Sequence, residues 1–284
     1  MSCVGDVVER GPAQAASPDQ PCVRNVIQTL GTFRVVINGM EITRWQAGRG
    51  QLLFQYLLTH QGHRVAKHVL IDAIWGDSRA KSPDIALKVA ICTLRRVLAQ
   101  AYAGNQPRVS IKSYGSSYAL DLGGITVDVE EFERMASAAA KLEVAAKSAA
   151  ATRLNQAAVT LYAGPYLPSC STNWAAIRRE RVKDRMLGAL SQLAAEAKRN
   201  GDRLAVFELH QKMLEVDPCR EESYRELMLW HAAERQPLRV QNWYHACAEQ
   251  LRTRLGLDPG SQTKRLLYDA ISGCFTSSYD CDSS

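Results

Sequence analysis

The 284-residue sequence lacks the features that mark membrane and secreted proteins. No uninterrupted apolar run approaches the roughly 18 residues that a membrane-spanning helix needs. The opening segment, MSCVGDVVERGPAQAASPDQP, carries acidic side chains and no apolar stretch of the kind found in signal peptides. We therefore expect a cytoplasmic protein, associated with the nucleoid if it binds DNA, with no membrane anchor.

Motifs that carry chemistry are also missing. The sequence contains no Cys-x-x-Cys, no Gly-x-x-x-x-Gly-Lys, no Gly-x-Ser-x-Gly, and no Gly-x-Gly-x-x-Gly after a strand. The scattered cysteines are typical of reduced cytosolic thiols rather than of a disulfide framework or a zinc site. They are Cys3, Cys22, Cys92, Cys170, Cys219, Cys247, Cys274 and Cys281.

Three histidines, His60, His63 and His68, lie close together in the sequence and invite a metal interpretation. They straddle a helix end and a turn, and no cysteine or paired carboxylate lies nearby, so solvated or capping histidines are favoured over a zinc site. The sequence thus predicts no enzyme, no catalytic residue, no metal and no cofactor.

Positive charge is concentrated in one part of the chain. The net charge is +6, but residues 24–112 hold 13 Lys and Arg against 4 Asp and Glu, which leaves the rest slightly acidic. Such asymmetry is expected when a module that meets a polyanion is joined to one that does not.

The segment Ser82–Tyr102 is predicted to be a helix with two distinct faces. Ser82 can cap it, Pro83 suits its first position and Asp84 suits its dipole. One face is an apolar stripe that must meet a core: Leu87, Ile91, Leu94 and Leu98. The other face bears no acid and holds Lys88, Val89, Cys92, Thr93, Arg95, Arg96 and Gln100. Taken alone, this face could be solvated or could contact DNA.

The surrounding pattern places that helix third in a small domain. Strands are expected at 26–30, 33–37 and 40–42, with an Asn38-Gly39 hairpin turn, and helices at 49–60 and 67–75. Ala66, a poor capping residue, precedes the second helix. Runs at 108–112 and 118–120 flank a small tip at 113–117, which predicts another hairpin. The order predicts a winged helix-turn-helix.

From Val127 onward the sequence is Ala-rich and helical. A helix is expected from Val127, with a break around Ser148–Thr152, followed by helices near 173–199, 202–215, 220–234, 238–255 and 261–272. The joins LEVDP and LGLDP recur with an offset of 41 residues, which indicates either a repeat of helix pairs or chance similarity of two helix ends.

The motifs resemble the Streptomyces antibiotic regulatory protein family. LGTFRVVINGMEI, LIDAIWGD, ALKVAICTLRRVL and YGSSYAL are similar to its OmpR-type winged helix, and LYAGPYLP, IRRERVKDRMLGAL, LEVDPCREESYRELM and LGLDPGSQTKRLLYDAI to its bacterial transcriptional activation domain. The expected fold is mostly α with small antiparallel sheets: a winged helix followed by tetratricopeptide-like helices. We expect a mobile leader at 1–22, a DNA-binding domain at 23–124, an activation domain at 125–273 and a flexible tail at 274–284.

The resemblance implies that the third helix enters the major groove and that the wing reaches the minor groove or backbone. Lys88, Arg95 and Arg96 would anchor the helix, and sequence preference would reside in Val89, Cys92 and Thr93. Arg49, before the first helix, could meet one phosphate. The wing would contribute Lys112, Ser113, Tyr114 and Ser116. The family commonly has more polar or basic residues at the positions that Ala90, Cys92 and Thr93 occupy here. It commonly has Gly at the position of Ser117.

Two further groups in the second domain have alternative interpretations. The aromatic residues Trp174, Tyr224, Trp230, Trp243 and Tyr244 could line a partner groove, although core positions are favoured. The run Arg178-Arg179-Glu180-Arg181 is expected to be a mostly solvated face of mixed charge, whose basic residues could also contact a partner.

The resemblance implies a transcriptional activator of a secondary-metabolite gene cluster. It would bind direct repeats in promoter double-stranded DNA as a homodimer and contact RNA polymerase holoenzyme. The alternatives are a repressor with the same DNA-binding domain, or an interaction scaffold that has lost DNA binding. The sequence leaves the operator, the pathway and any effector open.

Overall fold

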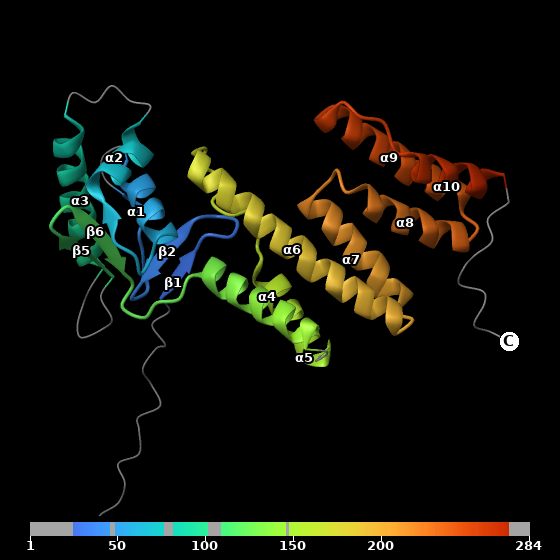
Figure 1. Ribbon diagram of the computed structural model, residues 1–284, viewed down its shortest axis with the longest axis horizontal. Helices are drawn as coiled ribbons and strands as arrows, with labels where there is room; N and C mark the ends of the chain where they lie inside the picture. Colours follow the sequence, from blue (N-terminus) through green and yellow to red (C-terminus); the bar gives the residue numbers. More distant parts are fainter. Residues whose placement is uncertain (1–24, 46–48, 77–81, 102–108, 146–147, 273–284) are drawn as a thin grey trace, which may run out of the picture.

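The computed structural model describes residues 25–45, 49–76, 82–101, 109–145 and 148–272. A compact α/β unit is followed by an array of helices that extends away from it (Figure 1). The predicted leader and tail, and the predicted end of the third helix at Tyr102, lie outside the described residues. The expected fold class, mostly helical with small antiparallel sheets, is confirmed.

The first unit opens with a three-stranded antiparallel sheet of strands β1 (Val26–Gln28), β2 (Arg34–Ile37) and β3 (Met40–Glu41), in that order. Asn38 and Gly39 form the predicted turn, with φ angles of +52° and +78°. Positive φ at both central residues is what a type I′ hairpin turn requires. The Asn38 side chain also donates to the carbonyl of Ala101, which ties this turn to the end of the third helix.

Three helices follow: α1 (Gly50–Thr59), α2 (Lys67–Trp75) and α3 (Pro83–Gln100). Ala66 precedes α2 and, as expected of a poor capper, makes no side-chain cap. Ser82 occupies the predicted cap position of α3, but its side chain makes no cap hydrogen bond either. The predicted apolar stripe of α3 is confirmed, because Leu87, Ile91, Leu94 and Leu98 are all buried.

The second small sheet contains the wing, which is the hairpin of β5 (Ser110–Tyr114) and β6 (Ser117–Asp121). β5 extends two residues beyond the predicted run at 108–112, and β6 extends the predicted run at 118–120 by one residue at each end, which leaves a two-residue tip, Gly115 and Ser116. A short third strand, β4 (Val65–Ala66), pairs with β6 and was not predicted. The wing is therefore held near its tip, at Ser117 and Tyr118, by the segment that leads into α2.

The second unit is a helical array whose bounds follow the prediction closely. Its helices are α4 (Asp128–Val144), α5 (Ser148–Leu161), α6 (Asn173–Arg199), α7 (Arg203–Val216), α8 (Glu221–Ala233), α9 (Pro237–Leu255) and α10 (Ser261–Ile271). The predicted break at Ser148–Thr152 was misplaced, because those residues are helical and α4 ends earlier. Each helix packs on the next, and α10 contacts both α8 and α9.

The two Asp-Pro joins occupy comparable places in this array. Asp217-Pro218 links α7 to α8, and Asp258-Pro259 links α9 to α10. The aromatic residues mostly support packing, as favoured: Tyr224 is buried, and Trp174 and Trp243 pack against core clusters.

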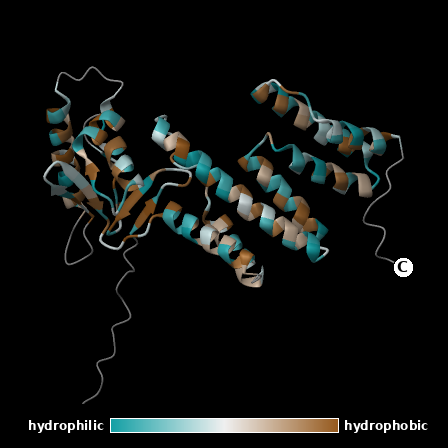
Figure 2. Ribbon diagram, in the orientation of Figure 1, coloured by the Kyte–Doolittle hydropathy of each residue, from teal (hydrophilic) through white to brown (hydrophobic). Residues whose placement is uncertain are grey.

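The two units share one core. A single cluster of buried side chains runs from Ile27 and Phe54 of the first unit to Tyr166 and Met186 of the second. In Figure 2, β1 and β2 are hydrophobic, whereas the first half of α6 is largely hydrophilic. A backbone crossing marks the contact, since Gly31 N donates to the carbonyl of Pro165.

Gly31 is needed where the two backbones cross. Its φ is +78°, and a Cβ there would lie 3.0 Å from the carbonyl oxygen of Ala163. Gly39 has the same φ of +78°, but a Cβ there would meet nothing within 4 Å. Substitutions at Gly31 and Gly39 therefore distinguish the cost of a strained backbone from the cost of crowding by a neighbour.

We predict that Gly39→Ala lowers the free energy of unfolding by about 1–2 kcal/mol, the cost of a left-handed backbone for an L-residue. Gly31→Ala should cost about 1–3 kcal/mol more, because the methyl group crowds the second unit. Urea unfolding of both variants measures the difference. Equal losses would show that the crossing tolerates a side chain.

Candidate nucleic-acid interface

Helix α3 presents an exposed surface, which we call the α3 face: Ile85, Lys88, Val89, Cys92 and Arg96. Ile85 and Val89 keep 62% and 55% of their surface exposed, although both are large and apolar. Each lies three residues before another exposed residue, Ile85 before Lys88 and Val89 before Cys92, on the side of the helix away from the buried stripe. Thr93, at the border, is half-buried.

Two cations of the α3 face are electrostatically uncompensated. Lys88 and Arg96 are exposed, and neither makes a hydrogen bond or ion pair with the part of the chain that the structure describes. They lie eight residues apart, about 12 Å along a helix that rises 1.5 Å per residue. Between them lie Val89 and Cys92, so the face has charged ends and a weakly polar centre.

Arg95 has a different role from its neighbour Arg96. Its guanidinium donates to the carbonyl of Ile111 from Nε at 3.0 Å and from Nη2 at 2.7 Å, and Nη2 also donates to Ser113 Oγ at 2.7 Å. This fork joins the middle of α3 to the first strand of the wing. Arg95 therefore sets where the wing sits relative to the α3 face.

The wing residues predicted as a site, Lys112, Ser113, Tyr114 and Ser116, are all exposed. Lys112 Nζ lies 2.5 Å from Asp121 Oδ2 on the paired strand. Their hydrogen bond raises the pKa of Lys112 and lowers the pKa of Asp121. Because its charge is already balanced, Lys112 is a weaker anion ligand than Lys88 or Arg96.

Sequence reasoning missed Arg64 and Ile85. The guanidinium of Arg64 lies 4.1 Å from the centre of the Tyr114 ring, so it adds an exposed positive charge to the wing. Its position before the short strand β4 gave no local signal. Ile85 did carry one, because it lies four residues before Val89 on the exposed side of α3.

Arg49, the remaining predicted residue, directly precedes α1 and is half-buried. The next residue, Gly50, has no room for a side chain, because a Cβ there would lie 2.6 Å from the carbonyl oxygen of Trp45. Among the described residues, no hydrogen bond or ion pair links Arg49 to α3 or the wing. The structure thus joins α3 to the wing by hydrogen bonds, whereas Arg49 is near α3 only through packing, because a Cβ on the adjacent Gly50 would lie 3.6 Å from Leu94 Cδ2.

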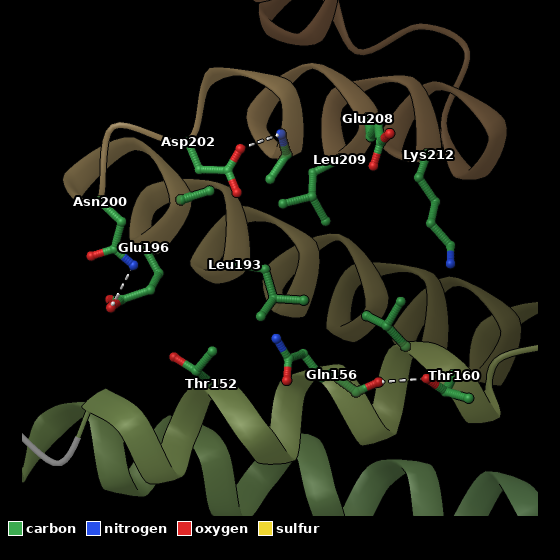
Figure 3. Close-up of a pocket in the computed structure, with 13 residues that line it drawn as sticks. Thr152, Gln156, Thr160, Leu193, Glu196, Asn200, Asp202, Glu208, Leu209 and Lys212 are labelled. Atoms are coloured by element: carbon green, nitrogen blue, oxygen red, sulfur yellow. Dashed lines mark hydrogen bonds between the residues drawn. The ribbon is translucent and has the colours of Figure 1, made fainter.

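The helical unit contains a separate groove of about 500 Å³ between α5 and α7, with α6 as its floor (Figure 3). Leu193 and Leu209 supply apolar surface, and Gln156, Glu208 and Lys212 supply polar groups. The described residues contain no group of three or more metal-binding side chains. Within the same residues, no helix is long and apolar enough to cross a membrane.

The sequence matches two protein families. Residues 127–271 match the bacterial transcriptional activator domain, and residues 48–120 match the family described as transcriptional regulatory protein, C terminal. Because the first match spans more than half of the sequence, the chain belongs to the bacterial transcriptional activator domain family. With its OmpR-type winged helix, it has the domain architecture of the Streptomyces antibiotic regulatory proteins.

A solved structure of Mycobacterium tuberculosis EmbR, in complex with a low-affinity phosphopeptide, has the same fold. The TM-score is 0.65 at 20% sequence identity, and the alignment covers 87% of this chain and 65% of the EmbR chain. This chain therefore spans less than two thirds of the length of that relative. A comparison with curated proteins gave no match.

Proposed function

We propose that this protein activates transcription of a biosynthetic gene cluster by binding direct repeats in its promoter and contacting RNA polymerase. The α3 face would lie in the major groove, with the wing on the neighbouring minor groove or backbone. The observation that carries the proposal is the pair of uncompensated cations, Lys88 and Arg96, on an exposed helix of a winged-helix domain.

The spacing of these cations suits a DNA groove. Their separation of about 12 Å along the helix is close to the width of the B-DNA major groove, also about 12 Å. Each can therefore meet a phosphate at an edge of the groove while the centre of α3 faces the bases. Phosphate contacts of this kind fix register and orientation but carry no sequence information.

Base preference is assigned to the weakly polar centre of the face. Val89 and the neighbouring Ile85 can pack on a thymine methyl group, and Cys92 and Thr93 offer small groups to base edges. Arg95 acts indirectly in this proposal, because its fork on Ile111 and Ser113 positions the wing. Arg64 and Tyr114 then form the part of the wing that meets the backbone.

The helical domain would mediate contact between two protomers on adjacent repeats and with the polymerase. Its assignment rests on membership of the bacterial transcriptional activator domain family. A repressor would use the same DNA-binding surface, and a scaffold would use only the helical domain. Affinity for DNA separates the scaffold from the other two, and transcription separates activator from repressor.

We predict that Lys88→Ala and Arg96→Ala each reduce the slope of log affinity against log salt concentration by about 1, because each removes one phosphate contact. The measurement is a titration of the protein against its own upstream promoter at several salt concentrations. Lys264→Ala, which removes an exposed cation from α10, is the matched control and should leave the slope unchanged. If neither α3 variant changes the slope, the α3 face does not meet DNA.

We also predict that the protein increases transcript yield from that promoter in a reaction containing only RNA polymerase holoenzyme, nucleotides and DNA. The physical reason is that a DNA-bound activator adds contacts that hold polymerase at the promoter. A template with scrambled repeats should show no stimulation. A decrease on the native template would establish the repressor alternative.

A further inference from the structure

The contact between the two units includes a buried arginine. Arg178, near the start of α6, keeps 12% of its side chain exposed. Its Nη1 donates to the carbonyl of Thr59, the last residue of α1, at 3.2 Å, and Nη2 meets Glu130 at 2.6 Å and Glu133 at 3.0 Å. The expectation that Arg178 lies on a solvated face was wrong, because its partner Thr59 is distant in the sequence.

The same place holds a second link across the units. The hydroxyl of Tyr166 lies 2.8 Å from Thr59 Oγ1, and the guanidinium of Arg178 lies 5.0 Å from the centre of the Tyr166 ring. Arg178 therefore binds a helix end of one unit while two acids of the other balance its charge. A buried cation with this many partners has one preferred position, since leaving any partner unpaired is costly.

A second attachment joins α4 to the end of β1. The carboxylate of Asp128, the first residue of α4, accepts hydrogen bonds from Thr29 N at 2.8 Å and Leu30 N at 2.9 Å. Thr29 Oγ1 donates to it as well, at 2.6 Å. The end of β1 is thus held by the helix that begins the second unit.

A third attachment comes from the segment between α5 and α6. Leu167 N donates to the carbonyl of Thr29 at 2.9 Å. Arg179 holds this segment in shape, because it donates to the carbonyls of Tyr166, Leu167 and Cys170. Arg179 was also expected to be solvated, and that expectation was wrong as well. We call the three attachments together the domain joint.

The domain joint ties the end of α1 and the end of β1 to α4, to α6 and to the segment between α5 and α6, and such multiple contacts oppose rotation of one unit against the other. We propose that the domain joint fixes the winged helix on the helical domain, and that Arg178 is thereby a positioning residue that sets the permitted spacing between the two DNA repeats. This inference rests on the proposed function, in which the helical domains of two bound protomers touch.

The reason lies in the geometry of DNA. Inserting one base pair between repeats moves the second site by 3.4 Å and turns it by about 35°, since a helical turn holds 10–10.5 base pairs. If a flexible tether joined the units, the helical domains could still meet after this change. With a fixed joint they cannot, so the cooperative part of binding should be lost.

The experiment first locates the repeats by a footprint on the protein's own upstream promoter. It then compares three duplexes: both repeats at native spacing, both repeats with one base pair inserted, and one repeat scrambled. Wild-type protein should bind the native duplex about tenfold more tightly than the inserted one, a ratio typical of coupling between sites. Arg178→Lys should reduce this ratio to about twofold or less. It keeps the charge but cannot reach Thr59, Glu130 and Glu133 together.

Two further variants keep the test independent of folding defects. Tyr166→Phe removes only the hydroxyl that meets Thr59, whose Oγ1 still donates to the carbonyl of Gln55 at 2.8 Å, and it should reduce the ratio partially. Arg181→Met, on an exposed position of the same helix, is the matched control and should retain the wild-type ratio. All variants should bind the single-repeat duplex within about twofold of wild type, because the α3 face is unchanged.

The outcomes separate the two proposals. If wild type binds no duplex, the proposed function fails. If wild type binds but Arg178→Lys and Tyr166→Phe keep its spacing ratio, the positioning role is overturned and the proposed function stands. If these variants lose affinity for the single repeat as much as for the pair, Arg178 supports folding rather than spacing, and the inference is again overturned.

Discussion

The carboxylate of Asp128 joins the two halves of the molecule. It accepts the backbone N–H groups of Thr29 and Leu30 at the end of β1 and, with Oδ1, the N–H of Val129 at the start of its own helix. Those donors would otherwise be unsatisfied inside a contact between units, which is expensive. The sheet of the winged helix and the first helix of the array therefore share one set of polar contacts.

This arrangement means that the winged helix is not a separate body on a tether. Its core continues into the helical unit, and Gly31 allows the two backbones to approach where no side chain fits. Stability of the DNA-binding part should therefore depend on residues of the activator domain. The same core connects α3 with α6 through packed side chains.

The positive charges of the winged helix fall into two classes that composition cannot distinguish. Lys112 is balanced by Asp121, and Arg95 is committed to the carbonyl of Ile111. Lys88 and Arg96 carry charge that nothing in the described structure satisfies. Since counterion release scales with the phosphates neutralised, the second class should dominate salt-dependent affinity. Lys112 and Arg95, the first class, shape the surface on which Lys88 and Arg96 are exposed.

Local sequence was sufficient to predict most of the fold. The sequence pattern predicted α2 and α6 with their correct ends. The pair Asn38-Gly39 predicted the first hairpin. Each of these signals lies within a few residues of the element that it predicts. The strand β4 was missed because two residues carry no periodicity. The break between α4 and α5 was misplaced, since the Ala-rich sequence there gives little contrast between helix and loop.

The site was predicted less completely, and for a physical reason. The exposed side of α3 follows from helical spacing alone, so Lys88, Val89 and Cys92 could be found. The partners of Arg95 and Arg178 lie 16 and 119 residues away, and no local pattern records such contacts. A run of charged residues has the same local sequence pattern whether it is solvated or packed against a distant helix end.

The central claim is that the α3 face lies in the major groove of promoter DNA, and Cys92 allows the most direct test. It is an exposed free cysteine at the centre of that face, whereas Cys170 and Cys247 are buried. A DNA-cleaving iron chelate would be attached to Cys92 after Cys3, Cys22, Cys219, Cys274 and Cys281 are replaced by serine. If the α3 face lies in the major groove, cleavage will be confined to the major groove of each repeat. Binding without localised cleavage would contradict this placement.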